Sequence, residues 1–203
     1  MSIRHLVVTV ALVCLLGGLV RTGLSVADES TDPDGRGSTV DSNAGGSLPV
    51  SDPTLSPLLT AAAAVLAQSI AFLRDEALNS GAEPLPDSIR SAFEGHLPDD
   101  VLNATRWKID AGGVSLLSGL LGISDTAAMA AGHVVIFAES ADTQRPLLWA
   151  HELFHVKQYL DWGGPGFAAR YVADTSAVEH EANQFVWQWR DAGGTIRMAP
   201  DSD

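Results

Sequence analysis

The stretch that decides the fold is Arg145–Leu160, RPLLWAHELFHVKQYL. Its apolar residues recur at helical spacing and predict one helix over about 145–160. Side chains four residues apart in a helix project from the same face, about one turn apart. His151 and His155 are therefore expected side by side, and Gln158 falls on the same face. Because the helix is apolar on its other sides, we expect it to be buried.

Two buried imidazoles separated by one helical turn are well placed to bind a single metal ion. Zinc takes tetrahedral nitrogen and oxygen ligands, and histidines at positions i and i+4 can both reach it. Glu152 lies beside the same face, where it is predicted to act as the general base that takes a proton from a metal-activated water. The plainer interpretation is a pair of core histidines that are hydrogen-bonded to the backbone.

A zinc site of this kind needs a third protein ligand. The single cysteine, Cys14, lies in an N-terminal apolar segment, so the ligand must be His, Asp or Glu. A second predicted helix, about 176–191, carries Glu179, His180 and Glu181. His180 points away from the apolar stripe of that helix, whereas the two acids flank the stripe on opposite edges. Helix geometry therefore leaves the choice between Glu179 and Glu181 open.

Four other polar residues have both a functional and a plainer interpretation. Asp174 is either a hydrogen-bond partner of a ligand imidazole or the cap of the following helix. His133 is either a metal ligand or a histidine at the start of a strand. Tyr159 and Tyr171 either stabilise an oxyanion or pack in the core.

The N-terminal part of the chain is not expected to join the folded domain. Residues 1–27 have a basic start, an uncharged apolar run and a small-residue site before Asp28, which is the layout of a signal peptide. The competing interpretation is a membrane anchor, although the apolar run would span only about 22 Å of a roughly 30 Å hydrocarbon core. Residues 28–53 are polar and glycine-rich, and they predict a disordered acidic linker.

One domain is predicted over residues 54–195, with a polar tail over 196–203. Its fold class is α+β and mainly helical, with two or three short strands. The predicted elements in this domain are helices over about 57–79, 87–93, 114–121, 145–160 and 176–191, and strands over 105–109 and 133–137. The glycine-rich segment 163–166 is expected to break the chain after the histidine-bearing helix.

The charge of the chain excludes one class of partner. The formal net charge is −13, from 25 acidic and 12 basic residues. A nucleic-acid-binding protein needs a basic surface, and nothing in this sequence supplies one. Together with the signal-like N-terminus, the sequence predicts an exported protein, periplasmic or extracellular, without stable membrane contact after cleavage. A membrane-anchored form is the minority interpretation.

Several segments resemble the bacterial extracellular contractile injection system (eCIS) core domain family. That family is considered to be a group of zincin metallopeptidases, of largely unknown function. The segments that carry the resemblance are PLPDSIR at 84–90, FEG at 93–95, TRWKI at 105–109, the strand within 132–137, and AHELFHVKQ at 150–158.

A further segment, EHEAN at 179–183, is similar to the Glu-x-x-Ala-Asp element of gluzincin peptidases. In that element the first Glu is the third zinc ligand, so the resemblance selects Glu179. Asn183 departs from the Asp of the element. The resemblance also implies a zincin-like fold, in which a small sheet packs on the metal-binding helix and a C-terminal helix carries the third ligand. Residues 133–138 would be an edge strand that binds peptide by β-addition.

The main hypothesis is therefore an exported, gluzincin-like zinc endopeptidase with a peptide or protein substrate. Its Zn²⁺ is held by His151, His155 and Glu179, and Glu152 is the catalytic base. The second hypothesis is a catalytically inactive zinc-binding effector or interaction module, associated with a bacterial secretion or injection system. The resemblance alone implies such a partner. The third hypothesis is a metal-free helical interaction protein.

Overall fold

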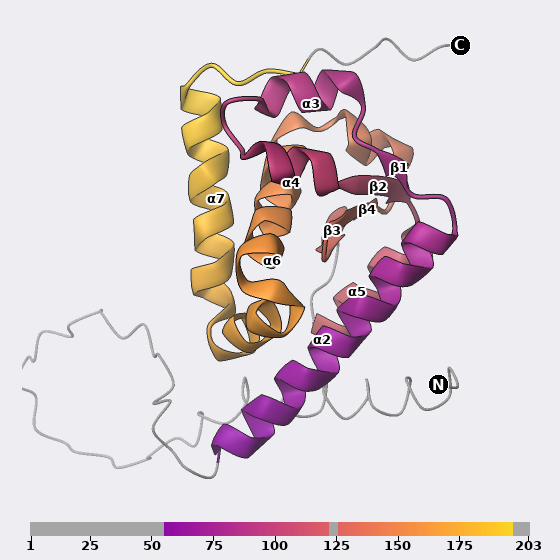
Figure 1. Ribbon diagram of the computed structural model, residues 1–203, viewed down its shortest axis with the longest axis vertical. Coiled ribbons are helices and arrows are strands. Elements are labelled where there is room, and N and C mark those ends of the chain that lie inside the picture. The colour runs from indigo at the N-terminus through magenta and orange to yellow at the C-terminus, as the bar shows by residue number, and fades with distance from the viewer. Residues whose placement is uncertain (1–54, 122–125, 197–203) are drawn as a thin grey trace, which may run out of the picture.

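The computed structural model describes residues 55–121 and 126–196. The predicted signal or anchor segment, the acidic linker and the tail after residue 196 lie outside these described residues. The described elements make a mainly helical α+β fold with one small sheet, as the sequence predicts (Figure 1). In chain order they are α2 Leu55–Asn79, β1 Glu83–Pro84, α3 Asp87–Phe93, α4 Asp99–Ala104, β2 Arg106–Ile109, α5 Ala111–Leu121, β3 Ala128–Ala131, β4 Val134–Phe137, the 3₁₀ helix η1 Ser140–Gln144, α6 Pro146–Ala173 and α7 Thr175–Asp191.

The four strands form one mixed sheet in the order β1-β2-β4-β3. Strands β2 and β4 are parallel, whereas β1 pairs antiparallel with β2 and β3 pairs antiparallel with β4. The predicted strands 105–109 and 133–137 correspond to β2 and β4. The sequence does not predict β1, which has two residues, or β3, whose Ala-Met-Ala-Ala lacks the β-branched and aromatic residues that favour strands.

Strand β4 lies inside the sheet, because it has a hydrogen-bonded neighbour on each side. The expectation that residues 133–138 form a substrate-binding edge is therefore wrong. All four residues of β4 are buried, since helices cover both faces. The ring of Phe137 lies 4.5 Å from that of Trp149 in α6, and Ile136 lies against Gly113 of α5. Strand β3 forms the edge beside α6 instead.

Helix α6 continues past its predicted end at residue 160 and reaches Ala173. Gly163 interrupts it with a φ of 67°, a left-handed value that glycine adopts without steric penalty. Pro165 falls in the first turn of the segment after the kink, where its missing N–H costs no helical hydrogen bond. The expected break at 163–166 is thus a kink centred on one glycine, and the chain resumes a helix at once.

Helix α7 folds back beside α6 (Figure 1). The Asp174 side chain accepts a hydrogen bond of 3.0 Å from the backbone N–H of Ala177, so Asp174 caps α7. Phe185 of α7 stacks on Phe154 of α6, with 5.2 Å between the ring centroids. The buried stripe of α7 is the predicted one, namely Val178, Ala182, Phe185, Val186 and Trp189.

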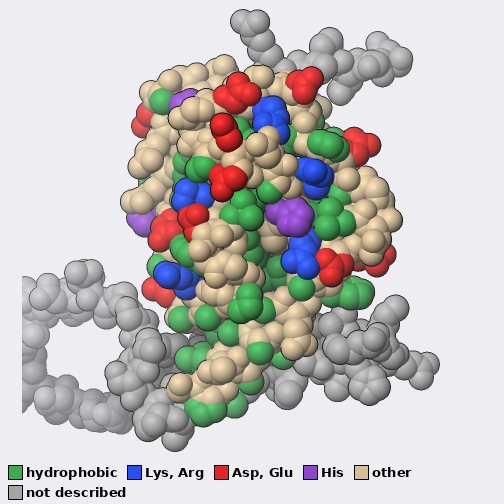
Figure 2. Space-filling view, in the orientation of Figure 1, with side chains coloured by type: hydrophobic (Ala, Val, Ile, Leu, Met, Phe, Trp, Pro, Cys, Tyr) green, Lys and Arg blue, Asp and Glu red, His purple; other side chains and the backbone are tan. Residues whose placement is uncertain are grey.

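Helix α2 has no charged residue from Leu55 to Leu73. Its C-terminal half packs on α6, α5 and the sheet, whereas its N-terminal end projects from the domain and presents hydrophobic side chains (Figures 1 and 2). Within the described ranges, Ser56–Asn79 is one helix that by length and composition would be able to cross a membrane, with a mean hydropathy of 1.7. Core helices of soluble proteins also meet this criterion.

Trp189 anchors α7 to α3. Its ring stacks on Phe93 at 4.7 Å, its Nε1 donates a 3.0 Å hydrogen bond to the carbonyl of Ala92, and only 1% of the residue is exposed. We expect Trp189→Ala to lower the free energy of unfolding by about 3–5 kcal/mol, because it leaves a cavity in the core. Urea unfolding measures the loss.

Trp187 is the matched control, since it lies on the same helix but is 52% exposed. Trp187→Ala should change the free energy of unfolding by no more than about 0.5 kcal/mol. Equal losses in the two variants would show that Trp189 is not the anchor.

Candidate metal centre

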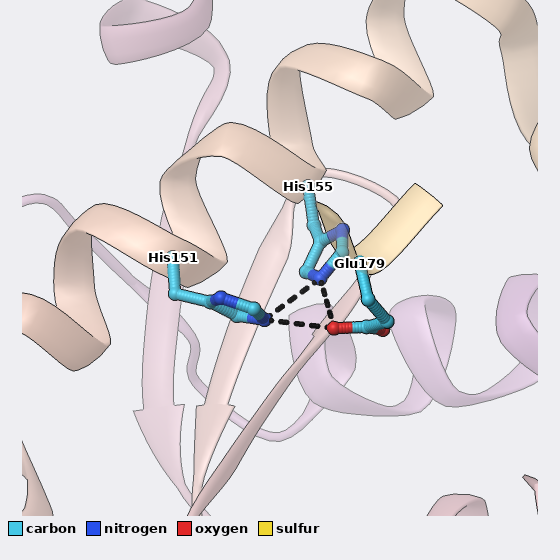
Figure 3. Close-up of side chains that lie close together, drawn as sticks. All are labelled: His151, His155 and Glu179. Atoms are coloured by element: carbon cyan, nitrogen blue, oxygen red, sulfur yellow. Dashed lines mark hydrogen bonds and ion pairs between the residues drawn. The ribbon is translucent and has the colours of Figure 1, made fainter. Parts of the chain in front are cut away.

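The side chains of His151, His155 and Glu179 converge between α6 and α7 (Figure 3). The two histidine Nε2 atoms are 3.0 Å apart. Glu179 Oε2 lies 3.2 Å from Nε2 of His151 and 3.6 Å from Nε2 of His155. Tetrahedral zinc ligands at roughly 2.0–2.2 Å from the ion are about 3.3 Å from one another. The three groups can therefore form a metal site, and their spacing fits zinc.

Three electron-rich atoms at these separations need hydrogen atoms or a cation between them. Burial alone would raise the pKa of Glu179, but the hydrogen bonds and charges of His151 and His155 outweigh it and hold the pKa well below its usual range. Burial alone would lower the pKa of His155, yet Glu179 and Glu152 raise it overall. Protons can thus hold the cluster together without a metal, and a divalent cation would replace them.

The hydroxyl of Tyr171 holds the outer oxygen of Glu179. It donates a 3.1 Å hydrogen bond to Oε1 of Glu179, and Oε2 of the same carboxylate faces the imidazoles. Tyr159 stacks on Phe167 at 3.8 Å and lines the adjoining cavity. Burial raises the pKa of the Tyr159 phenol well above its ordinary value, so this hydroxyl keeps its proton.

Glu152 adjoins the cluster without being one of the three converging groups. It is 4% exposed, and burial raises its pKa, with the charges of His155 and His151 opposing part of the shift. A backbone hydrogen bond from Ala130 in β3 also stabilises the carboxylate. The candidate base therefore lies between the three candidate metal ligands and the edge strand of the sheet.

The edge strand β3 has main-chain groups on the side that faces away from β4. The carbonyl of Ala127 accepts a hydrogen bond from the N–H of Ala138, and Ala128 lies opposite Phe137. Since hydrogen-bonded pairs alternate along an antiparallel ladder, the main-chain groups of Ala128 and Ala130 point away from β4.

A cavity of about 910 Å³ borders the cluster, which is a typical size for a ligand site. One wall carries the two imidazoles with Glu152 and Glu179, and the edge strand β3 contributes another. Apolar residues of α2 and α5 complete it, including Leu66, Ile70 and Leu117. The polar cluster thus lies in an otherwise largely apolar depression.

The remaining predicted candidates lie elsewhere. Glu181 does not join the cluster, because its Oε2 accepts a 2.9 Å hydrogen bond from Nε2 of Gln158. His180 is also outside the three-residue group. His133 lies in the turn between β3 and β4, where burial and then the charge of Arg74 lower its pKa. Asp174 caps α7, and the partner of its side chain in that cap is the backbone N–H of Ala177, which is not an imidazole.

Sequence reasoning assigned no role to Gln158, although it shares the face of the two histidines. In the structure it is 1% exposed, and its Oε1 lies 2.8 Å from Nδ1 of His155. The signal was a polar amide on the same face as the two histidines of a largely buried helix, where each polar group requires a partner. Two of its partners, Val178 and Glu181, lie on α7, and the sequence pattern of α6 alone does not show how α7 packs against it.

The part of the chain that carries Glu152 and the two histidines matches a known family. Residues 84–163 match the family model of the eCIS core domain. The matched segment runs from β1 to the kink of α6, so it includes the sheet, Glu152 and both histidines and ends before Glu179. The match supports the resemblance to that family over this part of the chain. No curated protein and no solved structure matches the chain significantly.

We expect the protein to bind one zinc ion and Glu179→Ala to weaken that binding strongly. Removing a ligand should cost more than the roughly 10–100-fold loss of affinity caused by removing an outer hydrogen-bond partner of a ligand. His180→Ala is the control, because it removes a metal-capable side chain at the next position. Competition with a chromophoric chelator measures both affinities. Unchanged affinity in Glu179→Ala would exclude this carboxylate as a ligand.

Proposed function

We propose that this chain is an exported, zinc-dependent peptidase. The observation that carries the proposal is the position of the three convergent ligand groups beside the buried carboxylate of Glu152, on the wall of one cavity. A metal site alone would not indicate hydrolysis. A metal site with an acid that is not a ligand, open to a cavity of ligand size, supports it.

His151 and His155 from α6 and Glu179 from α7 would hold the zinc ion. When bound, zinc supplies Lewis-acid chemistry by polarising a carbonyl group and by making water more acidic. Structural zinc sites usually have four protein ligands, whereas catalytic sites have three and leave one position for water or substrate. The described part of the chain offers a group of three, which favours the catalytic type.

Glu152 would serve as the proton carrier. Its carboxylate accepts a proton from the attacking water and then delivers that proton to the leaving amine. Burial favours the protonated form of Glu152, whereas the neighbouring imidazoles favour the ionised form. The carboxyl group is thus placed to pass between both forms during the reaction.

Strand β3 would take the substrate-aligning role that the family resemblance implied for residues 133–138. It is the edge of the sheet beside α6, and Ala128 and Ala130 line the cavity. An extended peptide that adds to this edge would place its backbone alongside Glu152 and the ligand cluster. The apolar residues of the cavity would receive its side chains.

A second candidate function is supported by the family match. The eCIS core domain carries the name of an injection system, and the matched residues 84–163 do not include Glu179. The chain would then be a zinc-binding module associated with such a system, without turnover of a substrate. Both candidates require the metal, and they differ in the role of Glu152.

We expect Glu152→Gln to retain zinc and to lose hydrolysis. The amide cannot accept the proton, so the rate should fall by roughly 10²–10⁴-fold or more. Glu139→Gln is the control, since Glu139 is an exposed acid upstream of α6. New N-termini in a denatured protein mixture, identified by mass spectrometry, measure cleavage, and chelator competition measures zinc.

Two results would contradict this assignment. Cleavage by Glu152→Gln at the parent rate would show that Glu152 is not the base. A parent protein that binds zinc and generates no new N-termini would favour the zinc-binding module.

A further inference from the structure

Gln158 links the two helices that carry the metal ligands. It lies three residues after His155 on α6 and is almost fully buried, with 1% exposure. Its Oε1 is 2.8 Å from Nδ1 of His155. Its Nε2 donates to two groups of α7, the carbonyl of Val178 at 3.2 Å and Oε2 of Glu181 at 2.9 Å. The amide therefore bridges a ligand imidazole to the opposite helix.

The partners of Gln158 determine which way its amide points. The Val178 carbonyl and the Glu181 carboxylate are both acceptors, so the amide nitrogen must face them. The amide oxygen then faces His155 as an acceptor, and Nδ1 of His155 must carry the hydrogen. A neutral imidazole has a single N–H. Its Nε2 is consequently left with a lone pair, and this is the atom that faces His151 and Glu179.

We infer that Gln158 and Glu181 are positioning residues, which fix the tautomer and ring orientation of His155 for metal binding. The chain of hydrogen bonds runs from Glu181 through Gln158 to His155 and crosses from α7 to α6. This inference rests on the metal-binding part of the proposed function and is independent of whether the chain hydrolyses peptides.

The same contacts set the position of α7 relative to the histidines. Glu179 lies between Val178 and Glu181 in the sequence, and each of these flanking residues accepts a hydrogen bond from Gln158. A single buried amide thereby orients one ligand and fixes the turn of helix that carries another. Outer partners of this kind orient metal ligands and affect metal affinity.

The arrangement gives Glu181 a role different from that of Glu179. One acid reaches the imidazole Nε2 atoms directly, whereas the other acts on the far nitrogen of His155 through an amide. Asp174, the outer partner considered from the sequence, is engaged at the start of α7. Gln158 occupies the position next to His155 that such a partner would need.

A reciprocal exchange of the amide and the acid tests this chain. Gln158→Glu places a carboxylate against Glu181 and the Val178 carbonyl, so the donor to α7 is lost and two acids face each other. We expect zinc affinity to fall by roughly 10–100-fold. Adding Glu181→Gln returns an amide donor to the pair, because the new amide can donate to the new carboxylate, and most of the lost affinity should return.

Gln184→Glu is the matched control, because it makes the same chemical change at an exposed position of α7. Circular dichroism verifies that each variant is folded. Rescue by the double variant would show that zinc binding depends on the hydrogen bond between positions 158 and 181, and the tautomer measurement below separates positioning from a merely structural role. Equal affinity in the parent, Gln158→Glu and Gln158→Leu would overturn the inference.

A second measurement reports the tautomer without any metal. Long-range ¹H–¹⁵N NMR spectra of the metal-free protein at alkaline pH distinguish Nδ1–H from Nε2–H imidazole. We expect His155 to be protonated at Nδ1 in the parent and to lose this preference in Gln158→Leu. The Nε2–H tautomer in the parent would refute the inference. Failure of the parent to bind zinc would instead refute the proposed function. The tautomer of His155 in the metal-free protein would then still decide whether Gln158 positions this imidazole.

Discussion

The contact between α6 and α7 brings a polar cluster into an interface that is otherwise made of apolar side chains. His155 and Gln158 are buried, and their polar atoms would be costly to bury without partners. Glu179 and Glu181 supply those partners from α7. Apolar contacts on either side, such as the stack of Phe154 on Phe185, also hold the two helices together. Packing and these polar contacts together bring the three candidate ligand groups to one place.

The kink at Gly163 divides α6 into two segments, and both of them contribute residues to the site. The segment before it carries the histidines, and in the segment after it the ring centroid of Phe167 lies 6.0 Å from that of His155. Phe167 stacks on Tyr159 and on Tyr171, with centroid distances of 3.8 and 5.5 Å. Tyr171 in turn donates to Glu179. The kink at Gly163 thus lets a short aromatic stack on α6 reach Glu179, the candidate ligand on α7.

The local pattern predicted the parts of this site that depend on one helix at a time. The spacing of His151 and His155 and the buried stripe of α7 follow from helical periodicity, and both appear in the structure. The choice between Glu179 and Glu181 depends on how α7 is rotated against α6, which periodicity does not contain. Strand β3 was missed for a similar reason, because its alanines form a strand only through pairing with β4.

The pKa of Glu152 depends on both the sheet and the histidine cluster. Desolvation raises its pKa, and the charges of His155 and His151, with the backbone hydrogen bond from Ala130, oppose that shift. The two imidazoles thus offset the burial of Glu152 while they also form a cluster with Glu179. Within the described residues, the interior strand β4 has a hydrogen-bonded neighbour on each side, whereas β3 has one on only one side. The acid is therefore buried at a point where the two imidazoles and the edge strand β3 both favour its ionised form.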